Sequence, residues 1–324
     1  MSRDKHLRLL ITGATGFLGA ALTKRLLRDP CFEVVAAVRR ESSNLVSSIQ
    51  SVVVGDMGSA TDWLPALSDV DVVIHAAARV HVMNDTAADP LVEFRKVNFE
   101  GTMKLARQSA ESGVKRFIFI SSIKVNGEAT VIGQPFTADD EPAPVDPYGV
   151  SKAETEQALL ELAASTGLEV VIIRPVLVYG PGVKANFRSL IKWLNKGIPL
   201  PLRLIRNKRS LVALDNLVDL ITICIDHPNA VNQVFLVSDN EDLSTAELLR
   251  RVGSALGVPA RLLPVPAWMI GVFATLVGKR DVSQRLLGSL QVDISKTRDL
   301  LDWEPPVSID DALQKTTQSF LLKK

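Results

Sequence analysis

Residues 9–22, LLITGATGFLGAAL, decide the fold. The apolar run predicts a strand over residues 7–11, and the amphipathic pattern predicts a helix over residues 17–28. Gly13, Gly16 and Gly19 stand where the strand ends and the helix begins. Glycines in that position permit a tight turn and let the backbone approach a pyrophosphate at the helix N-terminus. We therefore expect a dinucleotide-binding turn here, because a glycine-rich turn without a ligand is rarer in this context.

The alternation of strand and helix continues to residue 175. Short β-branched runs predict strands, and the longer amphipathic stretches between them predict helices. Such alternation indicates βαβ units, and the nearly continuous apolar character of the strands indicates helices on both faces of the sheet. The expected fold is therefore α/β, a doubly wound parallel Rossmann sheet. The expected strands cover residues 7–11, 33–38, 52–54, 72–75, 116–120 and 169–173, and the helices cover residues 17–28, 98–112 and 147–166.

The sequence changes character after Pro175. Proline and glycine become frequent, and two expected helices, residues 244–256 and 309–320, are separated by loops. We expect a dinucleotide-binding domain over residues 1–175. A smaller mixed α/β portion for the substrate should cover residues 176–324, from which the chain could cross back to the first domain. In doubly wound folds ligands bind beyond the carboxyl ends of the strands, where such a portion could close over them.

Composition excludes several classes of protein. Lys and Arg total 37 against 36 Asp and Glu, so the net charge predicts no nucleic-acid partner. Cys31 and Cys224 are the only cysteines, which excludes a disulfide framework and a four-cysteine zinc site, and we expect no metal. The charged residues 1–8 do not resemble a signal peptide, so a cytoplasmic protein is expected.

An apolar stretch covers residues 262–278. It contains two prolines and is at the short limit for spanning a bilayer, so we expect no integral membrane segment. A buried or surface-packed helix is the favoured interpretation, and a segment resting on a membrane surface is the alternative.

Tyr148 and Lys152 form the expected catalytic pair. They stand four residues apart in an expected helix, and therefore share one face. A neighbouring ammonium should stabilise the phenolate and lower the tyrosine pKa from near 10. Ser121 and Ser122 follow the strand expected over residues 116–120, at the edge where Rossmann ligands bind. This set predicts proton transfer at an oxygen while a nicotinamide cofactor carries the hydride.

Arg39 and Arg40 bear on the choice of cofactor. They follow the second expected strand, where an acidic residue would hold the ribose hydroxyls of NAD. A guanidinium can instead clamp a 2′-phosphate. We therefore favour NADP(H), with NAD as the alternative if the two arginines are only solvated surface charges.

These motifs resemble the extended short-chain dehydrogenases, the family of sugar-nucleotide epimerases, dehydratases and reductases. The Gly-x-x-Gly-x-x-Gly spacing and the Ser122, Tyr148 and Lys152 set carry the resemblance. It implies that these three residues are catalytic, that Ser121 is structural, and that the protein is a homodimer joined through helices 98–112 and 147–166. His75 has no partner at metal-ligand spacing and is expected to be structural.

The resemblance also implies the binding residues. Cofactor contacts are expected at Gly13, Thr15, Gly16, Phe17, Leu18, Gly19, Arg39, Arg40, Asp56, Met57, Ala76, Ala77, Ala78, Asn98, Tyr148, Lys152 and Pro175. Contacts with a UDP-sugar are expected at Ser122, Lys124, Asn126, Tyr148, Asn186, Arg209 and Arg280, with Arg285 as the rival of Arg280.

Residues 121–128, SSIKVNGE, point to one subgroup. Sugar-nucleotide 4-epimerases commonly carry Val-Tyr-Gly after the catalytic serine, and this segment instead resembles bacterial C4-ketoreductases of UDP-4-keto-6-deoxy-N-acetylhexosamines. The resemblance implies NADPH-dependent reduction of the C4 keto group for surface polysaccharide (lipopolysaccharide O-antigen) synthesis. A UDP-glucose or UDP-N-acetylglucosamine 4-epimerase is the enzymatic alternative. A non-catalytic NADP(H)-sensing regulator is the alternative of another class, and the intact catalytic set argues against it.

Overall fold

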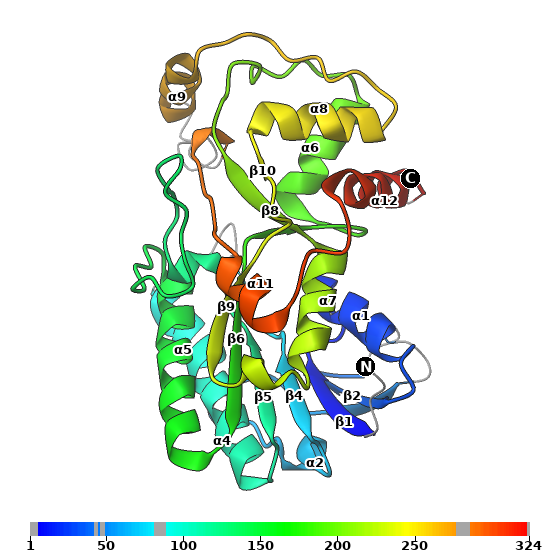
Figure 1. The fold of residues 1–324 in the computed structure, drawn as a ribbon, viewed down its shortest axis with the longest axis vertical. Coiled ribbons are helices and arrows are strands. Elements are labelled where there is room, and N and C mark those ends of the chain that lie inside the picture. Colours follow the sequence, from blue (N-terminus) through cyan, green and yellow to red (C-terminus); the bar gives the residue numbers. More distant parts are fainter. Residues whose placement is uncertain (1–5, 42–44, 46–48, 81–88, 277–285, 323–324) are drawn as a thin grey trace.

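A computed structural model describes residues 6–41, 45, 49–80, 89–276 and 286–322 of the chain (Figure 1). Its main sheet has seven strands in the order β3-β2-β1-β4-β5-β6-β9, and every neighbouring pair is parallel. This confirms the expected α/β class. The strands are β1 Leu7–Thr12, β2 Phe32–Val38, β3 Gln50–Val53, β4 Val72–His75, β5 Arg116–Ile120, β6 Glu169–Pro175 and β9 Gln233–Val237.

Helices cover both faces of the sheet because successive strand residues point to opposite sides. Leu9 and Ile11 of β1 pack in one buried cluster with helices α1 (Phe17–Leu26) and α7 (Leu214–Cys224). Leu10 packs in the opposite cluster with helices α2, α4 and α5. These helices comprise Leu64–Leu67, Thr102–Glu111 and Pro147–Thr166, respectively. The strand order reverses at β1, between β2 and β4, and this is the switch point where ligands bind in such folds.

The helix expected to begin at Asn98 begins earlier, so that boundary was wrong. Helix α3 (Pro90–Phe94) runs into the π-helix η1 (Arg95–Gly101), which continues as α4. The Asp89 carboxylate caps α3 by accepting hydrogen bonds from the backbone N–H groups of the second and third residues that follow. Pro90 suits the first helical position, where no backbone N–H is needed.

The chain crosses back to the main sheet after residue 175. Strand β9 pairs in parallel with β6, and sequence reasoning had assigned no strand there. A separate small sheet has the order β10-β8-β7, with strands Asp242–Leu243, Arg209–Ala213 and Leu177–Tyr179. It shares a second core with helices α6 (Ala185–Asn195), α8 (Thr245–Ala255) and α12 (Ile309–Leu322). The structure also describes the 3-10 helices η2 (Ile123–Val125) and η3 (Pro228–Ala230), and the helices α9 (Ala267–Leu276) and α11 (Ser295–Leu301).

Candidate active site

The glycine turn between β1 and α1 is tightly packed. Gly13 has a positive φ of 71°, and a Cβ on it would lie 2.8 Å from the backbone nitrogen of Ala77. A Cβ on Gly19 would lie 2.1 Å from the carbonyl oxygen of Gly13. The turn therefore needs glycine at both positions, because it is pressed between helix α1 and the segment after β4.

The N-terminus of α1 fits an anionic group. Gly16 is the N-cap, no side chain caps the helix, and its first turn contains no acidic residue. The first backbone N–H groups of such a helix and its dipole both favour a phosphate. Thr15 and Gly16 are exposed beside it, and Phe17 and Leu18 are partly buried. These residues would hold the pyrophosphate of a dinucleotide.

The residues expected at the adenosine ribose lie together at the surface. Arg39, after β2, forms an ion pair with Asp56, after β3, at 3.2 Å, and both side chains are largely exposed. Arg40 is exposed as well. An exposed pair of this kind contributes little free energy, so a ligand phosphate could replace the carboxylate as the partner of Arg39. Met57 packs against Gly101 of the π-helix, where a Cβ would come within 2.6 Å of the methionine Cγ.

His75 is a structural residue at the end of β4. Its side chain is fully buried, with Nδ1 2.8 Å from the Thr12 hydroxyl and Nε2 2.9 Å from the Thr102 hydroxyl. Burial lowers its pKa to about 3, and the charge of Lys152 adds to the effect. The imidazole is therefore neutral at physiological pH and links β1, β4 and α4, as expected from the sequence.

This shift predicts a loss of stability in acid. Between pH 6.5 and about 3 the unfolded chain binds a proton at His75 that the folded chain does not bind, so stability falls as the pH falls. The loss should approach about 1.4 kcal/mol per pH unit in this window. Urea unfolding of the wild type and of His75→Asn at pH 7, 6 and 5 would measure it. The free-energy difference between the two proteins should shrink as the pH falls, and a constant difference would refute the assignment.

Asn98 fixes the loop that follows β4. Its amide exchanges two hydrogen bonds with the backbone of Arg79, at 2.8 and 3.1 Å, and donates to the Ser151 hydroxyl at 3.1 Å. The side chain is buried. Asn98 therefore positions the segment that contains Ala76, Ala77 and Ala78, all partly buried, against α5. A direct cofactor contact of Asn98 stays a prediction.

Helix α5 begins beside Tyr148 and Lys152, the pair expected from the sequence to be catalytic. Asp146 is its N-cap and accepts a hydrogen bond of 2.6 Å from the Gly149 N–H, while Pro147 occupies the first turn. The Asp146 carboxylate also binds the ammonium of Lys124. A Cβ on Gly149 would lie 2.8 Å from the Lys124 carbonyl oxygen, so glycine lets the loop after β5 approach α5. Ser122, the second residue after β5, belongs to that loop, and its hydroxyl accepts a hydrogen bond from the Lys124 N–H.

Lys152 is buried beneath Tyr148. Its ammonium donates to the Ile120 carbonyl oxygen at 2.9 Å and lies 4.3 Å from the centre of the Phe119 ring. Burial lowers the Lys152 pKa to about 7, although Glu156 opposes this shift. The amine therefore changes protonation near neutral pH, as a proton relay requires.

The expectation that Lys152 lowers the pKa of Tyr148 was wrong for this structure. Burial raises that pKa to about 12, and the charge of Asp146 adds to the effect. The Lys152 ammonium lies 6.0 Å from the centre of the phenol ring and is directed to the Ile120 carbonyl. Phe94 meets the same ring edge-on at 5.9 Å. Desolvation of the phenolate therefore outweighs the distant cation.

Sequence reasoning missed a buried ion pair next to this site. Glu156 of α5 pairs with Arg174 of β6 at 2.6 Å, and accepts a hydrogen bond from Ser121. Arg174 also donates to the Asn126 side chain at 3.0 Å. The four-residue spacing that joins Tyr148 to Lys152 continues to Glu156, and could have indicated its place on the same helix face.

The residues expected to bind the substrate lie in separate parts of the structure. The Asn126 amide is buried and donates to the Thr137 carbonyl at 2.8 Å, so in this structure it supports the loop. Arg209, partly buried at the start of β8, donates to the Gly288 carbonyl at 3.1 Å. Asn186 lies on α6, but its side chain is outside the description. Arg280 and Arg285 lie outside the described residues, and Pro175 ends β6.

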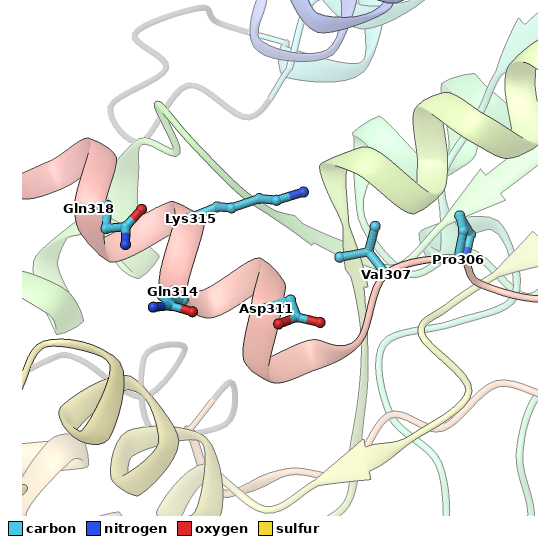
Figure 2. A pocket seen from close by; sticks show the side chains of 6 residues that line it. All are labelled: Pro306, Val307, Asp311, Gln314, Lys315 and Gln318. Carbon is cyan, nitrogen blue, oxygen red and sulfur yellow. The ribbon is translucent and has the colours of Figure 1, made fainter.

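A hollow on the C-terminal part lies apart from these residues. Figure 2 shows it along α12, and its lining residues are Pro306, Val307, Asp311, Gln314, Lys315 and Gln318. The cation among them, Lys315, already pairs with Asp215 at 2.6 Å. None of the predicted cofactor or catalytic residues lines this hollow. Among the described residues, no group of three or more His, Cys, Asp or Glu could hold a metal ion.

The chain is similar to nucleotide-sugar epimerases in both sequence and structure. The model of the NAD dependent epimerase/dehydratase family matches residues 9–238. A UDP-glucose 4-epimerase of Vibrio cholerae is 52% identical over 97% of this chain and 95% of its own length. An N-acetyl-alpha-D-glucosaminyl-diphospho-ditrans,octacis-undecaprenol 4-epimerase of Escherichia coli O157:H7 is 26% identical over 96% and 94%. The crystal structure of UDP-glucuronic acid 4-epimerase from Bacillus cereus in complex with NAD has a TM-score of 0.78 and 22% identity, covering 98% and 99%.

Proposed function

The chain belongs to the NAD dependent epimerase/dehydratase family, and from that premise we propose that it is a UDP-sugar 4-epimerase acting on UDP-glucose or a close analogue. The observation that carries the proposal is the 52% identity to a UDP-glucose 4-epimerase over nearly the whole chain. This identity ranks the epimerase above the C4-reductase that the SSIKVNGE segment suggested. UDP is the proposed carrier because the relative named for a lipid-linked sugar is much less similar.

The catalytic residues act at the C4 oxygen. Tyr148 takes the proton of the C4 hydroxyl and later returns one, while Ser122 donates a hydrogen bond to the same oxygen. When bound, an oxidised nicotinamide supplies a hydride acceptor and a positive charge that favours the Tyr148 phenolate. Lys152, with a pKa near 7, exchanges protons with its surroundings and places positive charge beneath the phenol. The remaining cofactor contacts are proposed at the glycine turn, at Arg39 and at the Ala76 segment.

A C4-ketoreductase is the second candidate, and two observations favour it. Arg39 and Arg40 stand after β2, where an acidic residue would suit NAD, and both are exposed, so that a ligand phosphate could reach them. A 2′-phosphorylated cofactor exchanges with a pool of reductant, which a reductase needs and an epimerase does not. The SSIKVNGE segment is the second observation.

Product analysis separates the two candidates. The purified protein is expected to interconvert UDP-glucose and UDP-galactose, or their N-acetyl counterparts, without net consumption of cofactor. The same preparation is then given UDP-4-keto-6-deoxy-N-acetylglucosamine with NADPH and, separately, with NADH. Oxidation of NADPH with the keto sugar, together with no epimer of either UDP-sugar, would replace the epimerase by the reductase. Cofactor binding without turnover in any assay would support a sensing regulator.

We also propose a cytoplasmic homodimer joined through α4 and α5. These helices lie side by side, and Arg107 and Leu162 line a shallow hollow between them. Helix pairs of this kind can form a four-helix contact across a two-fold axis. Light scattering of the purified protein would measure its mass.

A further inference from the structure

Helix α9 presents large apolar side chains to solvent. Trp268 is 70% exposed, Phe273 67% and Leu276 79%, so of the two expected arrangements, a buried or a surface-packed helix, the structure has the surface-packed one. Ile270 packs against the core of the C-terminal part, and therefore anchors one side of α9. Large apolar surfaces are rarely left in water, and they mark sites that bind a protein, a ligand or a membrane.

Two loops extend this apolar surface. Residues 196–206 and 257–266 run side by side, because the Leu200 N–H donates to Arg261 and the Leu263 N–H donates to Leu200, at 2.9 and 2.8 Å. Figure 1 shows both loops and α9 at the end of the molecule opposite α2 and α4. The exposed apolar side chains that define this apical face are Ile198, Leu204, Leu263, Trp268, Phe273 and Leu276.

The charge of the apical face has one sign. In the two loops that belong to it, residues 196–206 contain three Lys or Arg and no Asp or Glu, and residues 257–266 contain one Arg and no acidic residue. Lys196, Arg203 and Arg261 are exposed in the two loops. The whole chain is nearly neutral, so the positive charge is a local property of these loops and favours a negatively charged partner.

We propose that the apical face docks on the surface of an anionic phospholipid bilayer. Apolar and aromatic side chains insert at the boundary of headgroups and acyl chains, while lysine and arginine meet the anionic headgroups. Tryptophan, present here as Trp268, favours that boundary. No helix among the described residues is long and apolar enough to span a membrane, so α9 would lie in the plane of the interface. A second copy of the chain would bring the same positive charge to the contact, and is therefore disfavoured.

Vesicle flotation with the full-length protein tests the proposal. Wild type is mixed with vesicles of phosphatidylcholine alone or with phosphatidylglycerol added, at low and at high salt. Binding is expected only to the anionic vesicles, and should weaken at high salt. Trp268→Ser/Phe273→Ser should reduce the partition coefficient by about tenfold or more. Arg203→Glu/Arg261→Glu should remove the preference for phosphatidylglycerol.

A matched variant controls for a general loss of surface hydrophobicity. Leu64→Ser/Leu322→Ser replaces two apolar side chains, 50% and 87% exposed, that lie outside the apical face, and should bind like wild type. Failure of wild type to bind either vesicle would overturn the proposal, as would equal binding by the Trp268→Ser/Phe273→Ser protein. If wild type binds no vesicles but forms an oligomer, and the Trp268→Ser/Phe273→Ser protein does not form it, the face would be assigned to a second copy of the chain instead.

Discussion

Tyr148→Phe is expected to lower kcat by about a thousandfold, within the range that general acid–base catalysis contributes. The substitution removes only the phenolic oxygen that exchanges the proton with the C4 oxygen. Phe retains the ring that meets Phe94 edge-on, so the start of α5 should keep its packing. Turnover of the UDP-sugar and binding of the cofactor would be measured on the same preparations, and cofactor affinity should not fall comparably.

Tyr179→Phe is the matched control, because Tyr179 is the other tyrosine of the chain. It is fully buried and donates a 2.8 Å hydrogen bond to Asp239, away from the catalytic pair. Its removal should cost about 1 kcal/mol of stability and leave turnover near that of wild type. Unchanged turnover in Tyr148→Phe would remove Tyr148 from the mechanism. Equal losses in both variants would indicate damage to the fold.

The main sheet could be predicted because its signals are local. Apolar β-branched runs located β4 and β5 at the residues where the structure has them, and the helix of the catalytic pair also has the expected bounds. Strand β9 escaped prediction because it joins the sheet beside β6, and that pairing links residues distant in sequence. The π-helix escaped for a similar reason, since no short pattern distinguishes its wider turns from those of an α-helix.

At the candidate site, residue identities were predictable and their electrostatics were not. The spacing of Tyr148 and Lys152 indicates that they share a helix face, but not how deeply each is buried. Burial, which depends on β5 and α3, raises the pKa of Tyr148 and lowers the pKa of Lys152. Arg174, the ion-pair partner of Glu156, likewise lies on another element, strand β6. A charged side chain on a helix is usually solvated, and only the fold shows that the Glu156 carboxylate is buried.

Glu156→Ala is expected to cost about 3–5 kcal/mol of folding free energy, because it leaves the Arg174 guanidinium buried without its carboxylate. Both side chains are about 95% buried, with exposures of 5% and 4%. Urea unfolding would measure the loss.

The control is Glu154→Ala, two residues earlier on α5. Glu154 pairs with Arg95 at the surface, with exposures of 33% and 43%, so its removal should cost no more than about 1 kcal/mol. The double variant Glu156→Leu/Arg174→Met should recover much of the stability lost in Glu156→Ala, because it removes both charges and leaves neither unpaired. Similar costs for Glu156→Ala and Glu154→Ala would show that water reaches Arg174. A double variant less stable than Glu156→Ala would instead show that the hydrogen bonds to Ser121 and Asn126, and not the ion pair, hold the ends of β5 and β6 beside the catalytic helix.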